Sequence, residues 1–175
     1  MDIKGKNFLV IGGAGLIGSH AVDKLLEQDV GSVLIYDNFF RGNEENLQEA
    51  LKDPRVSIYE NGGDILHSDI LDSAMKGIDG VFHFAALWLL QCHEYPASAF
   101  DVNVRGTFNV MDACVKNNIS RLVYSSSASV YGDAEREPMD EDHPYNNKNF
   151  YGATKIASEA MMRAYHHRYG LNYVF

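Results

Sequence analysis

The stretch NFLVIGGAGLIG, residues 7–18, decides the fold. Its first half is an apolar run of strand length, and its second half carries Gly12, Gly15 and Gly18 at a regular spacing. Glycines between a strand and a helix let the backbone approach a diphosphate, whose charge then lies at the N-terminus of the helix. Tight packing of the strand against the helix would require the same glycines. The turn by itself therefore leaves a nucleotide site and a purely structural turn open.

After this turn the sequence keeps alternating between short apolar runs and longer helical patterns. The predicted strands are residues 7–13, 32–37, 56–61, 80–86, 121–127 and 171–175, and the predicted helices are residues 16–28, 43–51, 68–75, 96–117 and 149–169. Several strands are almost continuously apolar, which is typical of parallel strands covered by helices on both faces. The sequence therefore predicts an α/β fold with a doubly wound parallel sheet, the Rossmann fold, in the strand order 3-2-1-4-5-6.

The 175 residues contain neither a linker nor an internal repeat, so we expect one domain over residues 1–175. Because the last strand-like run reaches Phe175, we expect a truncated region of a longer protein. The chain enters its first strand without a signal peptide. Cys92 and Cys114 lack metal-type spacing and indicate free thiols. These features predict a cytoplasmic protein without a metal site.

The net charge of −9 argues against nucleic-acid and membrane partners, since both attract a cationic protein surface. The most apolar segment, residues 81–90, is also too short to cross a bilayer. Anionic small molecules remain possible ligands, because backbone N–H groups can hold phosphate without any cationic side chain.

Two carboxylates follow the second and third predicted strands. Asp37 lies 19 residues after Gly18, where an acid can accept hydrogen bonds from both hydroxyl groups of an adenosine ribose. A carboxylate there repels a 2′-phosphate and favours NAD over NADP, while Arg41, four residues later, weakens that preference. Asp64 could accept a hydrogen bond from the adenine amino group or could cap a helix, and the sequence leaves both roles open.

The candidate catalytic group lies at the end of the fifth strand and on the helix after it. The run SSSASVYG begins at Ser125, at the sheet edge where doubly wound folds bind ligands. Tyr151 and Lys155 are four residues apart and share one helix face. Lowering a tyrosine pKa from about 10 to neutrality takes roughly 4 kcal/mol, which Lys⁺ and an oxidised nicotinamide could supply together. A serine-rich strand end beside a packed tyrosine is the structural alternative.

With these residues collected, the chain resembles the extended short-chain dehydrogenase/reductase family, in its NAD-dependent nucleotide-sugar epimerase/dehydratase branch, and most of all the UDP-glucose 4-epimerase type. The resemblance covers nearly the whole chain and rests on GGAGLIGSH, YDN, GDI, HFAA, NVRGTFNV, SSSASVYG and YGATK in this order. It implies NAD as the cofactor, a nucleotide-sugar, in particular a UDP-sugar, as the substrate, and a C-terminal substrate domain that the 175 residues lack. It also implies a homodimer formed by the helices over residues 96–117 and 149–169.

The resemblance further implies a role for each matching residue. Ser127, Tyr151 and Lys155 form the implied catalytic set, and His83 is implied to be structural. Asn103 is implied to order the helix beneath the site. The implied cofactor-binding residues are Gly12, Gly15, Leu16, Ile17, Gly18, Asp37, Asn38, Asp64, Ile65, Phe84, Ala85, Ala86, Asn103, Tyr151 and Lys155.

The residues after Ser127 distinguish the reactions of this branch. In the family's 4,6-dehydratases an Asp-Glu pair follows the catalytic hydroxyl, and the decarboxylases usually carry an acid there. Here these positions are Ala128 and Ser129, which resembles the 4-epimerases. We therefore expect epimerisation at C4 of a UDP-hexose, with Tyr151 as base and Ser127 as proton relay. The alternatives are a reductase or dehydratase of another sugar or carbonyl substrate, and a non-catalytic NAD-sensing or scaffold protein.

Two segments depart from the family pattern. The family's TGG turn is IGG here, so Ile11 replaces a hydroxyl that steadies the loop. Residues 87–96, LWLLQCHEYP, lack the small polar sequence of common sugar epimerases. Trp88 and its neighbours could shape a different sugar pocket or belong to the core.

Overall fold

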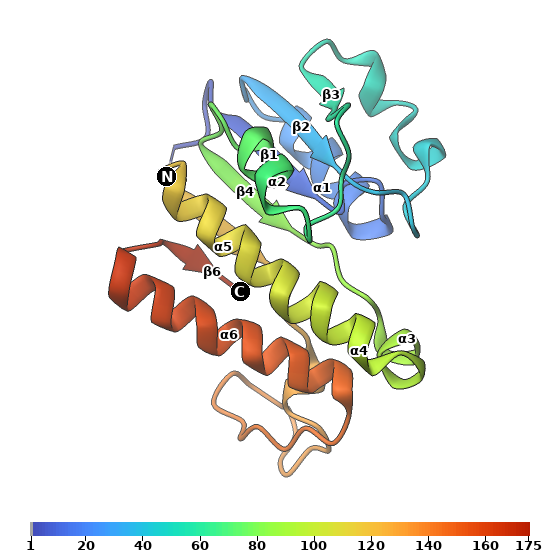
Figure 1. Cartoon of the computed structure of the whole chain (residues 1–175), viewed down its shortest axis with the longest axis vertical. Coiled ribbons are helices and arrows are strands. Elements are labelled where there is room, and N and C mark those ends of the chain that lie inside the picture. The colour runs from blue at the N-terminus through green and yellow to red at the C-terminus, as the bar shows by residue number, and fades with distance from the viewer. Residues whose placement is uncertain (1) are drawn as a thin grey trace.

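Six parallel strands form one sheet in the order β3-β2-β1-β4-β5-β6 in the computed structural model, which describes residues 2–175 (Figure 1). The strands are β1 (Asn7–Ile11), β2 (Ser32–Tyr36), β3 (Val56–Ile58), β4 (Gly80–His83), β5 (Arg121–Tyr124) and β6 (Tyr173–Val174). The predicted fold class and strand order are therefore confirmed. Each strand ends one to three residues earlier than predicted, because the chain turns away at the carboxyl ends.

Helices cover both faces of this sheet. They include α1 (Leu16–Leu26), α2 (Ser68–Ala74), α5 (Thr107–Lys116) and α6 (Phe150–Tyr169). Successive strand residues point to opposite faces, so Phe8 and Val10 of β1 pack in the apolar cluster that includes α1. Leu9 and Ile11 pack in the second cluster, with α2, α5 and α6. In Figure 1, α5 and α6 lie side by side across the front of the sheet.

The strand register brings four chain segments to one edge of the sheet. Ile11 at the end of β1 is aligned with Tyr36 on β2 and with His83 on β4. His83 is in turn aligned with Tyr124 on β5. The segments that follow these residues therefore leave the sheet together, at the edge where doubly wound folds bind their ligands.

The helix predicted over residues 43–51 is wrong. This segment forms two 3₁₀ turns instead, Glu44–Leu47 and Ala50–Lys52. Leu47 and Ala50 are its buried apolar residues, and their separation of three positions matches the 3₁₀ period.

The helix predicted over residues 96–117 consists of three parts: α4 (Pro96–Ala99), a π-helix (Phe100–Gly106) and α5. A short helix that the sequence pattern does not indicate, α3 (Leu89–Glu94), precedes them. Cys92 is the single buried residue of α3, so the sequence of this helix shows no repeating apolar pattern from which it could be predicted. The π-helix carries Asn103 into the interior, and such wider turns are frequent at functional sites.

Gly18 sets how closely α1 approaches the turn after β1. A Cβ at this position would lie 2.1 Å from the carbonyl oxygen of Gly12 and 2.7 Å from the Cα of Gly13. Both neighbours are backbone atoms, so no side-chain rotation could relieve the clash. The closeness of α1 to β1 therefore depends on the missing Cβ.

We predict that Gly18→Ala lowers the free energy of unfolding by up to about 2 kcal/mol, because overpacking costs about 1–3 kcal/mol and alanine's better helix propensity returns about 1 kcal/mol of this. Gly15→Ala is the matched control, because its Cβ would lie 3.3 Å from the Gly12 oxygen, which a small shift accommodates. Urea unfolding of both variants measures the difference, and equal stability of the two would contradict the packing argument.

Candidate active site

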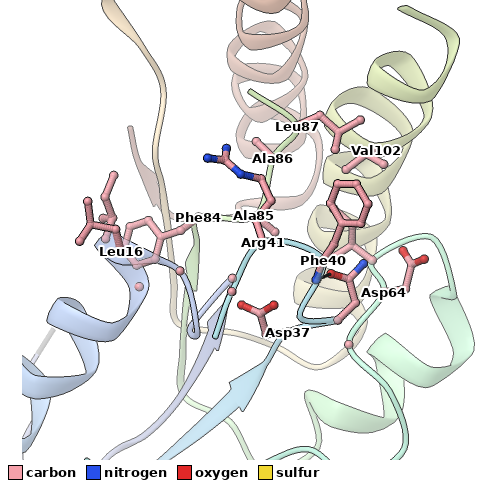
Figure 2. A pocket seen from close by; sticks show the side chains of 18 of the residues that line it. Leu16, Asp37, Phe40, Arg41, Asp64, Phe84, Ala85, Ala86, Leu87 and Val102 are labelled. Atoms are coloured by element: carbon pink, nitrogen blue, oxygen red, sulfur yellow. Dashed lines mark hydrogen bonds between the residues drawn. The ribbon is translucent and has the colours of Figure 1, made fainter. Parts of the chain in front are cut away.

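A cavity of about 650 Å³ opens at the carboxyl edge of the sheet, beside the ends of β1, β2 and β4 (Figure 2). Its walls come from the glycine turn, the segment after β2, the segment after β3, the segment after β4 and the start of the π-helix. The lining residues are Gly12, Gly15, Leu16, Ile17, Gly18, Asp37, Asn38, Phe40, Arg41, Gly42, Asn46, Gly63, Asp64, Ile65, Phe84, Ala85, Ala86, Leu87, Ser98 and Val102. All the sequence-predicted cofactor residues except Asn103, Tyr151 and Lys155 are among them.

The glycine turn presents open backbone at one wall of this cavity. Gly12 has a left-handed φ of 78°, and a Cβ there would lie 2.6 Å from the backbone nitrogen of Ala85, so the position requires glycine. Gly15 occupies the N-cap position of α1 and provides no side-chain cap. The N–H groups in the first turn of a helix lack intrahelical partners. The structure thus offers an anion-binding helix N-terminus with backbone that a diphosphate could approach.

Asp37 lies directly after β2 and faces the same cavity. Its Oδ2 accepts a hydrogen bond from the backbone N–H of Ala14 at 2.9 Å, and its Oδ1 accepts one from Phe39 at 2.8 Å. Each carboxylate oxygen can accept further bonds. These two contacts fix the orientation of the carboxylate and leave it capacity for a ligand's hydroxyl groups.

Asp64 lines the cavity after β3, and its Oδ1 accepts a hydrogen bond from Leu66 N–H at 2.9 Å. Helix α2 begins only at Ser68, with His67 at the N-cap position. Asp64 therefore stabilises a turn and does not cap the helix, so that alternative is wrong.

Asn103 lies outside the lining, on the π-helix, and is buried. Its Oδ1 accepts a hydrogen bond from Leu87 N–H at 2.7 Å, and its Nδ2 lies 3.0 Å from the Leu87 carbonyl oxygen. The same nitrogen lies 3.2 Å from the Thr154 hydroxyl of α6. Asn103 thus fastens the cavity wall after β4 to the helix that carries Tyr151. It holds these two parts in position and does not line the cavity.

Lys155 on α6 is buried, and its Nζ donates a hydrogen bond to the backbone oxygen of Ser125 at 2.8 Å. The same Nζ lies 4.5 Å from the ring centroid of Tyr124 and 5.6 Å from that of Tyr151. Burial lowers the pKa of Lys155 to about 8, against the opposing influence of Cys92 and Glu159. Lys155 therefore joins the end of β5 to the helix face that carries Tyr151.

Tyr151 is half-buried on that face, close to Ser127. Burial raises the pKa of Tyr151, while hydrogen bonding with the Ser127 hydroxyl acts in the opposite direction. The sequence reasoning expected Lys155 to help lower this pKa. In the structure burial has the larger effect on this pKa, and the Lys155 ammonium is hydrogen-bonded to the Ser125 carbonyl.

The sequence reasoning missed a buried carboxylate one turn beyond Lys155. Glu159 accepts hydrogen bonds from the Ser126 hydroxyl and from Tyr145, and Arg163 lies 3.8 Å away. It thereby fastens the loop before α6 to the end of β5. The signal was present, since residues four apart share a helix face, but an acid at that spacing is also common on exposed helices.

Several other sequence expectations concern the chain outside the cavity. His83 is buried, with its Nε2 3.0 Å from the Thr107 hydroxyl, and burial lowers its pKa to about 3. Both Cys92 and Cys114 are buried free thiols. Within residues 2–175 we find neither a cluster of three metal-ligating side chains nor a helix long and apolar enough to cross a membrane.

We predict that the buried Lys155 makes stability depend on pH. Its folded pKa of about 8 lies below the unfolded value of about 10.4, so the burial cost applies fully below pH 8 and disappears as the pH rises toward 10.4. The free energy of unfolding of Lys155→Met relative to wild type should therefore fall by roughly 3 kcal/mol between pH 7 and pH 10.5.

Urea unfolding across this pH range measures that difference. Lys52→Met, which removes an exposed lysine, is the control and should show a nearly constant difference. A constant difference for Lys155→Met as well would show that the ammonium is not desolvated in the folded chain.

Comparison with known proteins agrees with this geometry. The model of the "NAD dependent epimerase/dehydratase family" matches residues 8–175. A putative UDP-glucose 4-epimerase of Methanocaldococcus jannaschii is 36% identical over 168 residues, covering 94% of this chain and 52% of that protein. UDP-glucuronic acid decarboxylase 3 of Arabidopsis thaliana is 31% identical over 169 residues, covering 93% and 47%. A dTDP-glucose 4,6-dehydratase of an Actinoplanes species is 34% identical over 174 residues, covering 95% and 54%.

Solved structures give the same picture. UDP-N-acetylglucosamine 4-epimerase from Methanobrevibacter ruminantium, in complex with UDP-N-acetylmuramic acid, superposes with a TM-score of 0.88 at 34% identity, covering 97% of this chain and 53% of that one. UDP-glucose 4-epimerase from Brucella ovis, in complex with NAD, gives a TM-score of 0.86 at 34% identity, covering 96% and 50%.

The chain thus spans about half the length of the relatives it matches, and these relatives are named as a putative epimerase, a decarboxylase and a dehydratase. The predicted family and its cofactor, NAD, are confirmed. With its glycine turn, its Asp37 and its match over residues 8–175, this chain belongs to the NAD dependent epimerase/dehydratase family.

Proposed function

We propose that this chain is the cofactor-binding part of a nucleotide-sugar 4-epimerase that acts on a UDP-hexose. The main support for this proposal is the contact between the end of β5 and helix α6. Lys155, bonded to the Ser125 carbonyl, holds the strand end that bears Ser127 against the helix face that bears Tyr151. That face is fastened to the cavity wall through Asn103.

The cavity fits NAD through residues of this chain. The backbone at Gly12 and the open first turn of α1 suit the diphosphate. Asp37, with its carboxylate oriented by Ala14 and Phe39, suits the hydroxyl groups of the adenosine ribose. Arg41 lies against the Trp88 ring, and the ion pairs found within residues 2–175 do not join it to Asp37, so the Asp37 carboxylate keeps the negative charge that disfavours a 2′-phosphate.

In the proposed mechanism Tyr151 takes the proton of the sugar C4 hydroxyl and later returns it. NAD, when bound, supplies reversible acceptance of the hydride from the same carbon. Ser127, beside Tyr151, relays or positions the proton. Lys155 holds this pair in place and adds positive charge that favours the phenolate. The sugar passes through a ketone and regains its hydrogen on the other face.

The surroundings of Ser127 favour epimerisation over dehydration or decarboxylation. Ala128 and Ser129 follow Ser127 in a 3₁₀ turn and provide no carboxyl group. The buried carboxylate nearby, Glu159, is occupied by Ser126 and Tyr145. Reversible hydride transfer needs no acid beyond the Tyr151 pair, whereas removal of water requires one. A reductase is the second enzymatic candidate, and a non-catalytic NAD sensor would have no need of Tyr151 and Lys155.

We predict that the full-length protein interconverts UDP-glucose and UDP-galactose without net formation of NADH. Sugar products separated by chromatography, together with absorbance at the NADH band, measure both quantities. GDP- and dTDP-sugars complete the panel and test the nucleotide. NADH accumulating in proportion to substrate would contradict the epimerase activity and indicate a dehydrogenase. A 4-keto-6-deoxy product would indicate a dehydratase instead.

We predict that Tyr151→Phe lowers turnover at least 100-fold, the lower end of the range for a general base, while leaving NAD affinity within about threefold. Turnover is measured with the same panel, and NAD affinity by calorimetry. Tyr95→Phe is the control, since this exposed phenol contacts Glu94 and not the catalytic pair. Retained turnover in Tyr151→Phe would remove Tyr151 from the role of base.

We also propose a cytoplasmic homodimer that pairs α5 and α6 with their symmetry mates. Phe108 on α5 and Tyr169 on α6 are exposed, and both rings pack against Tyr165. Paired helices in a four-helix bundle would bury these rings.

We predict that light scattering gives a dimeric mass for the full-length protein and a monomeric mass for Phe108→Glu. Phe40→Glu, which places the same charge on an exposed phenylalanine after β2, is the control and should remain dimeric. A monomeric wild type would contradict the proposed assembly.

A further inference from the structure

Arg41 and Trp88 are in contact beside the cavity, and the proposed mechanism does not use this pair. The Cζ of Arg41 lies 4.8 Å from the centroid of the Trp88 ring, within the range of a cation–π interaction. Arg41 follows β2 and Trp88 follows β4, and these strands are the two neighbours of β1. The contact therefore joins the segments on either side of the glycine turn.

The guanidinium of Arg41 keeps its hydrogen-bonding edge available. Contact with an aromatic ring uses none of the five N–H donors of the guanidinium. The ion pairs found within residues 2–175 do not include Arg41. In Figure 2 its side chain lies beside Ala86 and points away from Asp37 and Asp64. Trp88 thus holds a cation in place without neutralising it.

The charges that line the cavity favour a role for Arg41 in binding an anionic ligand. Among the described residues that line the cavity, Arg41 is the one cation, and Asp37 and Asp64 are the acids. The diphosphate of a dinucleotide brings two more negative charges into this acidic wall. The N-terminus of α1 contributes only about half a positive charge. Lys155 cannot contribute here, because it lies outside the lining and donates to Ser125.

We propose that Arg41, oriented by Trp88, completes the diphosphate site that the first turn of α1 begins. The inference rests on the placement of NAD proposed above. A guanidinium matches phosphate with two parallel hydrogen bonds, and holding it on an aromatic ring reduces the entropy lost on binding. Its direction away from Asp37 separates it from the ribose end of the cavity, where a 2′-phosphate would bind.

Calorimetry on the full-length protein, freed of bound nucleotide, tests this with Arg41→Ala, Arg41→Lys and Trp88→Leu. The probes are NAD, ADP, adenosine, NADP and UDP. Arg168→Ala is the matched control, because it removes another arginine within cation–π range of a ring, with its Cζ 5.3 Å from the Tyr169 centroid near the end of α6. Arg41→Ala should weaken NAD and ADP roughly 10- to 100-fold, the value of a charged hydrogen bond, and leave adenosine and UDP unchanged.

Arg41→Lys should retain part of the affinity, and Trp88→Leu should lose about twofold to fivefold. Unchanged adenosine binding shows that the variants are folded. The inference is overturned if Arg41→Ala weakens only NADP, if it weakens UDP equally, or if it has no more effect than Arg168→Ala. Asp37→Ala distinguishes failure of this inference from failure of the proposed NAD placement. If Asp37→Ala loses NAD binding and Arg41→Ala does not, only the role of Arg41 is refuted. No loss in either variant refutes the placement of NAD as well.

Discussion

The close approach between the turn after β1 and helix α1 is the constraint on which the rest of the structure depends. Gly18 can lie against the Gly12 carbonyl only because it has no Cβ, and Gly12 can lie against Ala85 for the same reason. These two contacts bring the first turn of α1, the end of β1 and the segment after β4 to one place. Hydrogen bonds from Ala14 and Phe39 then fix Asp37 at the same edge. The cavity is the space that this arrangement leaves open.

Helix α6 carries two buried charged groups, Lys155 and Glu159, and each of them needs polar partners. Lys155 is stabilised by the Ser125 carbonyl and by the faces of Tyr124 and Tyr151. Glu159 is stabilised by hydroxyl groups and lies near Arg163. Burying an ionised group costs several kcal/mol unless polar partners replace water. The partners found here all come from the end of β5 and the segments around α6, so they also orient the strand end that carries the catalytic serine.

The cavity and α6 are coupled through Asn103 and the π-helix. The amide of Asn103 holds Leu87 of the cavity wall and approaches Thr154 of α6. A regular α-helix over residues 96–117 would turn this residue differently relative to its neighbours, because a π turn contains more residues per turn. Its place between the two regions suits a residue that keeps cofactor and catalytic groups in register. Arg41 and Trp88 form a second link, between the walls on either side of the glycine turn.

The sequence by itself determined the strand order, the glycine turn, the placement of Asp37 and the helix face shared by Tyr151 and Lys155. The glycine turn, the placement of Asp37 and the shared helix face are local, because turn glycines and residues four apart are read within a few positions. The strand order follows from the alternation of strands and helices together with the right-handed crossovers of a doubly wound sheet. Only the tertiary structure decided which side chains meet across the chain. The contact of Arg41 with Trp88 spans two crossovers, and the partners of Glu159 come from a strand end and a loop. Such contacts leave no periodic trace, because they depend on how whole elements pack and on where a 3₁₀ or π turn redirects the chain.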